Sequence, residues 1–216
     1  MFADRRDAGR QLADRLAGHA AMDPVIVAMP RGGVPVAAEV ADRLGAPLDV
    51  IVVRKIGCPW QPELGIGAVA EGGVRILNEA LVAETGVTSH QLEEATNREE
   101  AELARRVRRY RGTRPAVPVE DRVVVLVDDG LATGYTARAA VAALRAKGAG
   151  RVIIAVPVAP KEGVAAMRRV TDEVVVIETP SWFFAIGEFY QDFSQTSDDE
   201  VLTTLERAAA RSPRAA

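Results

Sequence analysis

The chain has 216 residues, of which 48% are hydrophobic and 26% are charged, and its formal net charge is -3. These values are ordinary for one globular domain, so we expect residues 1–216 to form a single unit. The negative charge argues against a dedicated nucleic-acid-binding protein. One cysteine cannot form an internal disulfide, and no apolar run approaches the roughly 20 residues that span a bilayer. The sequence therefore predicts a cytoplasmic protein without a membrane segment.

Short β-branched runs alternate along the chain with longer segments of helical periodicity. This alternation predicts an α/β fold with a mostly parallel, Rossmann-like central sheet flanked by helices. Ligands of such sheets bind beyond the carboxyl ends of the strands, so we examine the segments that follow each strand. The expected strands are 25–28, 48–53, 122–127, 151–156 and 173–177, and the expected helices are 34–44, 91–110, 136–147 and 161–170.

The first expected strand runs into Arg31, Gly32 and Gly33 before a helix begins. Paired glycines allow consecutive N–H groups to point into one concavity, and an arginine can bridge two oxygens of a diphosphate. The same residues would also suit an ordinary tight turn between a strand and a helix. This segment alone does not separate the two interpretations.

The second expected strand is followed by Arg54 and Lys55, and cations at a strand end suit a phosphate-rich ligand. The next segment, 57–73, is rich in glycine and proline. Glu63 and Glu71 in this segment are candidate proton acceptors for an N–H nucleophile. Solvated loop acids are the alternative interpretation of both.

The expected middle helix, 91–110, has acidic residues early and arginines late, as the helix dipole favours. A solvated or subunit-facing helix is one interpretation, and we expect a homodimer. A patch that contacts RNA is the other interpretation. The arginines concerned are Arg105, Arg106, Arg108, Arg109, Arg111 and Arg114.

The third long strand, 122–127, runs directly into a loop that two adjacent carboxylates begin. Such carboxylates repel each other and need cations or hydroxyl donors, which Mg²⁺ and sugar hydroxyls would supply. Thr133, Gly134 and Thr136 then place hydroxyls and N–H groups at a helix N-terminus, which favours a phosphate. A turn with solvent-facing aspartates is the alternative. The loop consists of Asp128, Asp129, Gly130, Leu131, Ala132, Thr133, Gly134, Tyr135 and Thr136.

This loop resembles the phosphoribosyl pyrophosphate motif of type I phosphoribosyltransferases, in which a hydrophobic strand and two acids precede small residues and Thr-Gly-x-Thr. The resemblance implies that Asp128 and Asp129 hold the ribose hydroxyls and help to place Mg²⁺, directly or through water. It also implies that 132–136 binds the 5-phosphate. Ala132 stands where 6-oxopurine enzymes have an aspartate, which disfavours hypoxanthine and guanine as acceptors. Gly130 is a mild departure, because a larger apolar residue is commoner there.

The last expected strand is followed by a segment, 182–193, that holds six of the ten aromatic residues. In type I enzymes a hood of terminal segments covers the site and selects the acceptor, so these rings are candidates for stacking on a flat base. Anchoring the C-terminal tail or burying a subunit contact are the alternatives. The candidate hood residues are Trp182, Phe183, Phe184 and Tyr190.

From about residue 4 to about residue 205 the chain resembles a family of bacterial predicted phosphoribosyltransferases of unsettled substrate. The resemblance implies a core at about 20–178 and a hood with a C-terminal helix at about 179–210. It also implies a flexible flap at about 57–73 that closes over the site and excludes water. Arg31-Gly32-Gly33 would be the pyrophosphate loop, with Arg54 and Lys55 as its basic neighbours.

The implied reaction is Mg²⁺-dependent transfer of the 5-phosphoribosyl group from phosphoribosyl pyrophosphate to a nitrogen nucleophile, a base or an amine, with release of pyrophosphate. Catalysis would depend on Arg31, Lys55, Asp128 and Asp129. The second hypothesis is a non-catalytic sensor of the same ligand that regulates RNA or a protein partner.

Overall fold

The centre of the protein is a five-stranded sheet, seen in a computed structural model that describes residues 1–211. Its strands run in the order β2-β1-β6-β7-β8, and every neighbouring pair is parallel. This confirms the predicted α/β class with a parallel central sheet. The strands are β1 Val25–Ala28, β2 Leu48–Val50, β6 Val123–Val127, β7 Arg151–Val158 and β8 Glu173–Glu178.

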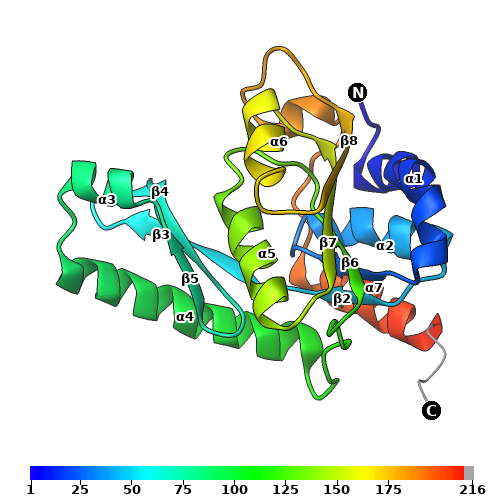
Figure 1. Ribbon diagram of the computed structural model, residues 1–216, viewed down its shortest axis with the longest axis horizontal. Helices are drawn as coiled ribbons and strands as arrows, with labels where there is room; N and C mark the ends of the chain where they lie inside the picture. The colour runs from blue at the N-terminus through cyan, green and yellow to red at the C-terminus, as the bar shows by residue number, and fades with distance from the viewer. Residues whose placement is uncertain (212–216) are drawn as a thin grey trace.

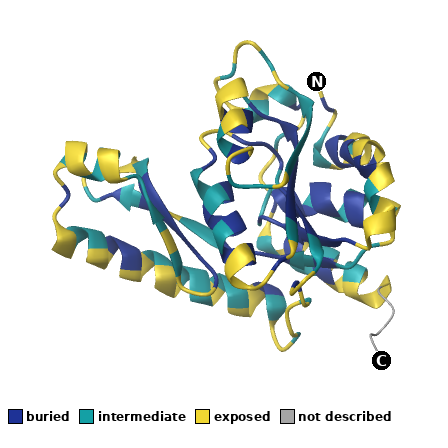
Figure 2. Cartoon of the chain, viewed as in Figure 1, coloured by how far each residue is buried: buried dark blue, intermediate teal, exposed yellow. Residues whose placement is uncertain are grey.

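Helices cover both faces of this sheet, and Figure 1 shows it between the two layers. On one face, residues such as Val27, Leu126 and Ile154 pack against α5 (Tyr135–Ala146) and α6 (Lys161–Met167). On the other face, the alternate residues pack against α1 (Arg5–Leu16) and α2 (Gly33–Leu44). Both faces are therefore apolar, which explains the continuous Val and Ile runs and the buried strands in Figure 2.

Helix α1 is absent from the elements that the sequence predicted. Its N-cap is Asp4, whose side chain accepts a hydrogen bond from the backbone of Asp7. Leu12 and Leu16 are the large side chains that it buries, and a 3-10 helix, η1 (Ala17–Met22), follows it. The segment is highly charged and has few apolar residues, so its periodicity is weak in the sequence.

The residues between β2 and β6 form an arm that projects from the body, at the left in Figure 1. It contains an antiparallel sheet of three strands and two helices. These are β3 (Val53–Cys58), β4 (Gln61–Ala70), β5 (Val74–Leu77), α3 (Glu79–Thr85) and α4 (Ser89–Arg111).

The predicted flap, 57–73, is mostly regular strand, and its closing over a site stays a prediction. Its glycines allow strands to approach closely. At Gly67, for example, an added Cβ would lie 2.7 Å from the carbonyl oxygen of Ile76 on the neighbouring strand. The predicted strand 48–53 is likewise divided, because the chain leaves the parallel sheet after Val50 and enters the arm at Val53.

A buried set of charged residues, Asp49, Glu71 and Arg111, joins the arm to the body, and we call it the junction cluster. Glu71 is 6% exposed and accepts hydrogen bonds from the backbone of Val52 at 2.8 Å and from Arg111 Nη1 at 2.6 Å. Arg111 Nε lies 3.3 Å from Asp49 Oδ1. Glu71 is thus a structural carboxylate, neither a mobile proton acceptor nor a solvated loop acid.

The chain ends with an irregular segment that contains η2 (Ile186–Phe189), followed by helix α7 (Asp198–Arg211). Helix α7 packs on α2 and brings Val201 and Leu205 into the same core as α1. Arg211 is the last residue of α7, and residues 212–216 lie outside the described residues. Within 1–211, no helix has both the length and the apolar character needed to cross a bilayer.

Candidate functional site

The loops that follow β1 and β6 lie in contact at the carboxyl edge of the parallel sheet. The two strands are neighbours, and the backbone of Met29 donates a hydrogen bond to Val127 O at 2.9 Å. An added Cβ at Gly32 would collide with the carboxylate of Asp129, and one at Gly33 would lie 3.1 Å from Asp128 Oδ1. Glycine is required at both positions because the two loops approach so closely. The structure thus brings Arg31-Gly32-Gly33 and the two aspartates together.

The paired carboxylates lie in a poorly solvated environment. Burial, followed by repulsion from Asp129, raises the pKa of Asp128 well above its usual range. Burial also raises the pKa of Asp129, while the nearby guanidinium of Arg5 opposes that shift. Asp128 Oδ1 accepts a hydrogen bond from the backbone N–H of Asp129 at 2.9 Å, which orients it. Cations or hydroxyl donors at this edge would relieve the repulsion between the two groups.

Arg5, the first residue of α1, completes this group and was not found by sequence reasoning. Its Nε lies 2.8 Å from Asp129 Oδ2, and both side chains are 12% exposed. The two residues are 124 positions apart. Arg5 belongs to no motif, and the charged N-terminal segment gave no signal that one of its arginines would be buried against the loop.

The second half of the loop leads into helix α5. The backbone N–H of Leu131 donates to Val158 O at 2.9 Å, which ties the loop to the end of β7. Ala132 and Thr133 are exposed, and Gly134 adopts a left-handed φ of 76° as the N-cap of α5. The Tyr135 hydroxyl accepts a hydrogen bond at 2.6 Å from Asn78 Nδ2 of the arm. The exposed turn and the helix N-terminus form a suitable place for a phosphate.

The unusual Gly130 has a partner in the hood segment. An added Cβ there would lie 2.6 Å from Cγ2 of Ile186. The side chain of Ile186 thus occupies the space into which a larger residue at position 130 would extend. This contact explains why the departure from the motif is tolerated.

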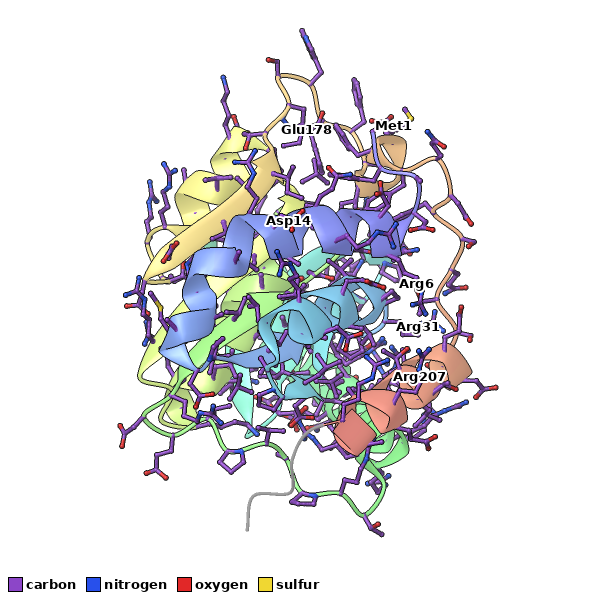
Figure 3. The ribbon with its side chains drawn as sticks, turned by 90° about the vertical axis from the view of Figure 1, so that its right-hand side faces the viewer. Met1, Arg6, Asp14, Arg31, Glu178 and Arg207 are labelled. Carbon is purple, nitrogen blue, oxygen red and sulfur yellow. The ribbon has the colours of Figure 1, made fainter. Side chains whose placement is uncertain are left out.

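Arg31 lies on the face that α1, α2 and α7 share, which Figure 3 views directly. Its Nη1 is 3.8 Å from Asp198 Oδ1 at the start of α7, and its side chain is partly exposed. The pKa of Asp198 is lowered, first by the hydrogen bond from the Tyr110 hydroxyl and then by Arg109 and Arg31. Arg31 is therefore positioned by an ionised carboxylate while remaining next to the glycines.

Among residues 1–211, no hydrogen bond or ion pair joins Arg54 or Lys55 to Arg31, and their sharing of one pyrophosphate site stays a prediction. Arg54 Nε lies 2.8 Å from Glu99 Oε2 on α4, and Lys55 Nζ lies 3.6 Å from the largely exposed Glu63. Both cations line a cavity between the β3–β4 hairpin and α4. The reason is topological, because β3 has left the parallel sheet and pairs with β4.

The aromatic residues of the hood segment divide into two groups. Trp182 and Phe184 are each 81% exposed, and with Phe183 they line a cavity of about 270 Å³ beside the start of α6. Phe183 also stacks on Phe189, with ring centroids 5.6 Å apart. Tyr190 differs because it is buried against Phe2 and Phe193, and its hydroxyl donates to Asp129 O at 2.6 Å. Tyr190 therefore anchors the hood to the loop and has no free face on which a base can stack.

The late arginines of α4 make contacts within the chain. Arg105 and Arg106 both pair with Glu102, at 2.7 and 2.8 Å, and Arg109 pairs with Asp198 at 3.1 Å. Arg111 belongs to the junction cluster. These ion pairs reduce the positive charge that this helix offers to an RNA backbone.

Residues 5–194 match the family described as the phosphoribosyl transferase domain, and the chain belongs to that family. Its relatives include a Mycobacterium tuberculosis protein, known from strains CDC 1551 and H37Rv and provisionally named a phosphoribosyl transferase. The two are 50% identical over 208 residues, which cover 96% of this chain and 47% of the relative. This chain thus spans about half the length of the curated relatives.

A crystal structure of the protein TT1426 from Thermus thermophilus is similar throughout. Its TM-score is 0.82 at 42% sequence identity, and the match covers 96% of this chain and 98% of that one. The arm and the hood segment are therefore included in the matched structure. Neither relative's name specifies an acceptor.

Proposed function

We propose that the protein transfers the 5-phosphoribosyl group of phosphoribosyl pyrophosphate to a nitrogenous acceptor and releases pyrophosphate. The observation that carries this proposal is the contact between the two loops, in which Gly32 and Gly33 pack directly against Asp129 and Asp128. A diphosphate and a ribose attached to each other need their binding groups side by side. At this edge of the sheet, the glycines of the first loop and the two aspartates of the second are in direct contact.

Each part of the edge has a role in the proposal. The backbone N–H of Gly32 and the guanidinium of Arg31 bind the pyrophosphate and stabilise it as it departs, while the N–H of Gly33 donates to Met29 O and fixes the turn. The carboxylates of Asp128 and Asp129 accept hydrogen bonds from the ribose hydroxyls. The turn at 132–136, in which Ala132 and Thr133 are exposed, and the N-terminus of α5 hold the 5-phosphate.

The donor atoms present suit a Mg²⁺ ion that is bound together with its ligand. Within residues 1–211 no cluster of three or more His, Cys, Asp or Glu side chains could hold a metal ion. Mg²⁺ commonly takes one or two carboxylates and completes its shell with waters and ligand phosphates. Asp128 and Asp129 would be those carboxylates, and their mutual repulsion favours a cation there. When bound, the ion would neutralise charge that develops on the pyrophosphate.

We propose that the acceptor binds under the exposed hood residues Trp182, Phe183 and Phe184, next to the phosphate turn. An added Cβ at Gly163 of α6 would lie 3.1 Å from Ala132 O, so the turn and the start of α6 are adjacent. Aromatic surface there suits a flat heterocycle. The apolar Ala132 offers no carboxylate to a 6-oxopurine. The alternative of an RNA-regulating sensor receives less support, because Arg105, Arg106 and Arg109 are engaged in ion pairs.

The test is pyrophosphate release from Mg²⁺–phosphoribosyl pyrophosphate against a panel of purine bases, pyrimidine bases and simple amines. We expect release that depends on one class of acceptor and is lost in Asp128→Asn. An acceptor-free control measures hydrolysis alone. Donor binding without release for any acceptor, together with salt-sensitive RNA binding, would favour the sensor instead.

A further inference from the structure

We propose that Arg5 is a positioning residue of the donor site and that it couples the Asp128–Asp129 loop to the hood. This inference rests on the proposed function, because it concerns the same donor site. We use the term hood strap for residues 189–194, which cross from η2 toward α7.

Arg5 contacts the loop and the hood strap with different parts of one guanidinium. Its Nε binds Asp129 Oδ2 at 2.8 Å, and its Nη1 donates to Ser194 O at 2.7 Å. The Arg5 Cζ atom also lies 3.9 Å from the centroid of the Phe193 ring. A planar group with several donors can satisfy these three contacts at once, which a lysine ammonium cannot do.

Asp129 is held from three sides by these neighbours. The guanidinium of Arg5 donates a hydrogen bond to Asp129 Oδ2, and Gly32 packs against the same carboxylate. The Tyr190 hydroxyl donates a hydrogen bond to the main-chain oxygen of Asp129. The remaining oxygen, Oδ1, is the one that a ribose hydroxyl can use. Arg5 therefore fixes the direction in which Asp129 presents that oxygen.

Arg5 also sets the charge of the edge. Without it, two adjacent carboxylates would face an incoming ligand that carries phosphate groups, and the repulsion would weaken binding. Because the same guanidinium holds Ser194 and Phe193, a ligand that uses Asp129 must also stabilise the hood strap. Coupling of this kind is reciprocal, so a loosened strap must weaken donor binding.

The test compares Arg5→Gln and Arg5→Lys with Arg6→Gln as the matched control. Arg6 is the next residue on α1, is 54% exposed, and has a salt bridge at 3.4 Å to Glu39 on α2. Titration calorimetry measures the Kd for Mg²⁺–phosphoribosyl pyrophosphate, and hydrogen exchange measures protection of 189–194 with and without that ligand.

We expect Arg5→Gln to raise the Kd about tenfold or more and to abolish ligand-induced protection of the hood strap. Arg5→Lys restores a cation beside Asp129, so most of the affinity returns while the strap protection does not. Arg6→Gln stays within about twofold of the unmodified protein. Phe193→Leu is a second variant that leaves the Asp129 ion pair in place, and we expect faster strap exchange with a smaller loss of affinity.

Three outcomes of these measurements distinguish a failure of the proposed function from a failure of the Arg5 inference. If the unmodified protein does not bind the donor, the proposed function fails and this inference fails with it. If the unmodified protein binds but Arg5→Gln binds equally well with the same strap protection, only the inference fails. If Arg5→Gln binds more tightly, Arg5 blocks the site, and its assignment as a positioning residue is overturned.

Discussion

Removing the cation of the junction cluster, by Arg111→Met, is expected to destabilise the protein strongly. The side chains of Arg111, Asp49 and Glu71 are only 14%, 13% and 6% exposed. Methionine would leave two buried carboxylates without their shared partner, and breaking a buried ion pair in this way costs about 3–5 kcal/mol. Lys147 Nζ lies 3.5 Å from Glu71 and compensates in part, so we expect the lower end of that range.

Urea denaturation followed by circular dichroism gives the free energy of unfolding. The matched control is Arg105→Met on the same helix, because Arg105 is 52% exposed and an exposed ion pair such as its bridge to Glu102 adds little to stability. In the double variant Arg111→Met/Glu71→Gln, the amide still accepts from Val52, and Asp49 is the one carboxylate left without its partner. We therefore expect the double variant to be more stable than Arg111→Met alone. Equal losses for Arg111→Met and Arg105→Met would refute the assignment of a buried structural cluster.

Three further variants test other contacts. Gly32→Ala places a Cβ against the carboxylate of Asp129, so calorimetry should show donor affinity reduced about tenfold or more, whereas Gly18→Ala, which has open space around it, should bind normally. Tyr190→Phe removes the donor to a buried carbonyl and should cost about 1–3 kcal/mol in urea denaturation; an unchanged midpoint would contradict the anchoring role. The pKa of Asp198 is lowered from 3.8, chiefly by a tyrosine hydroxyl on α4, so its ionised form stabilises the fold above that value. Asp198→Asn should therefore be less stable than the unmodified protein at pH 7, and the difference in their free energies of unfolding should shrink as the pH falls below about 4. A difference that does not change with pH would contradict a stabilising role of the ionised Asp198.

The parallel sheet was predictable because strands that are buried on both faces consist of nearly continuous apolar residues in the sequence. Strands β6 and β7 are nearly continuous runs of Val, Ile and Leu, and the polar loop after β6 is conspicuous beside them. Carboxyl ends of neighbouring parallel strands share one edge, so the pairing of β1 with β6 brings Gly32 against Asp129; the sequence did not predict that strand order.

The contacts missed by sequence reasoning join residues far apart in the chain. Arg5 and Asp129 are separated by 124 positions, and nothing in a charged N-terminal helix indicates which arginine turns inward. The glycines of 57–73 predicted a flap, and the sequence did not show that Gly67 allows β4 to approach β5 closely. Tyr190 is one of several aromatic residues in its segment, and only the fold distinguishes the buried anchor from the exposed rings.

Calorimetric titration of the protein with Mg²⁺–phosphoribosyl pyrophosphate tests the central claim most directly. We expect saturable binding to the unmodified protein and severe loss of affinity in Asp128→Asn/Asp129→Asn, because neutral amides remove the charges that hold Mg²⁺ and the acceptors that hold the ribose. Circular dichroism of the double variant checks that its fold is retained. A folded double variant that binds with unchanged affinity would show that the donor site lies elsewhere.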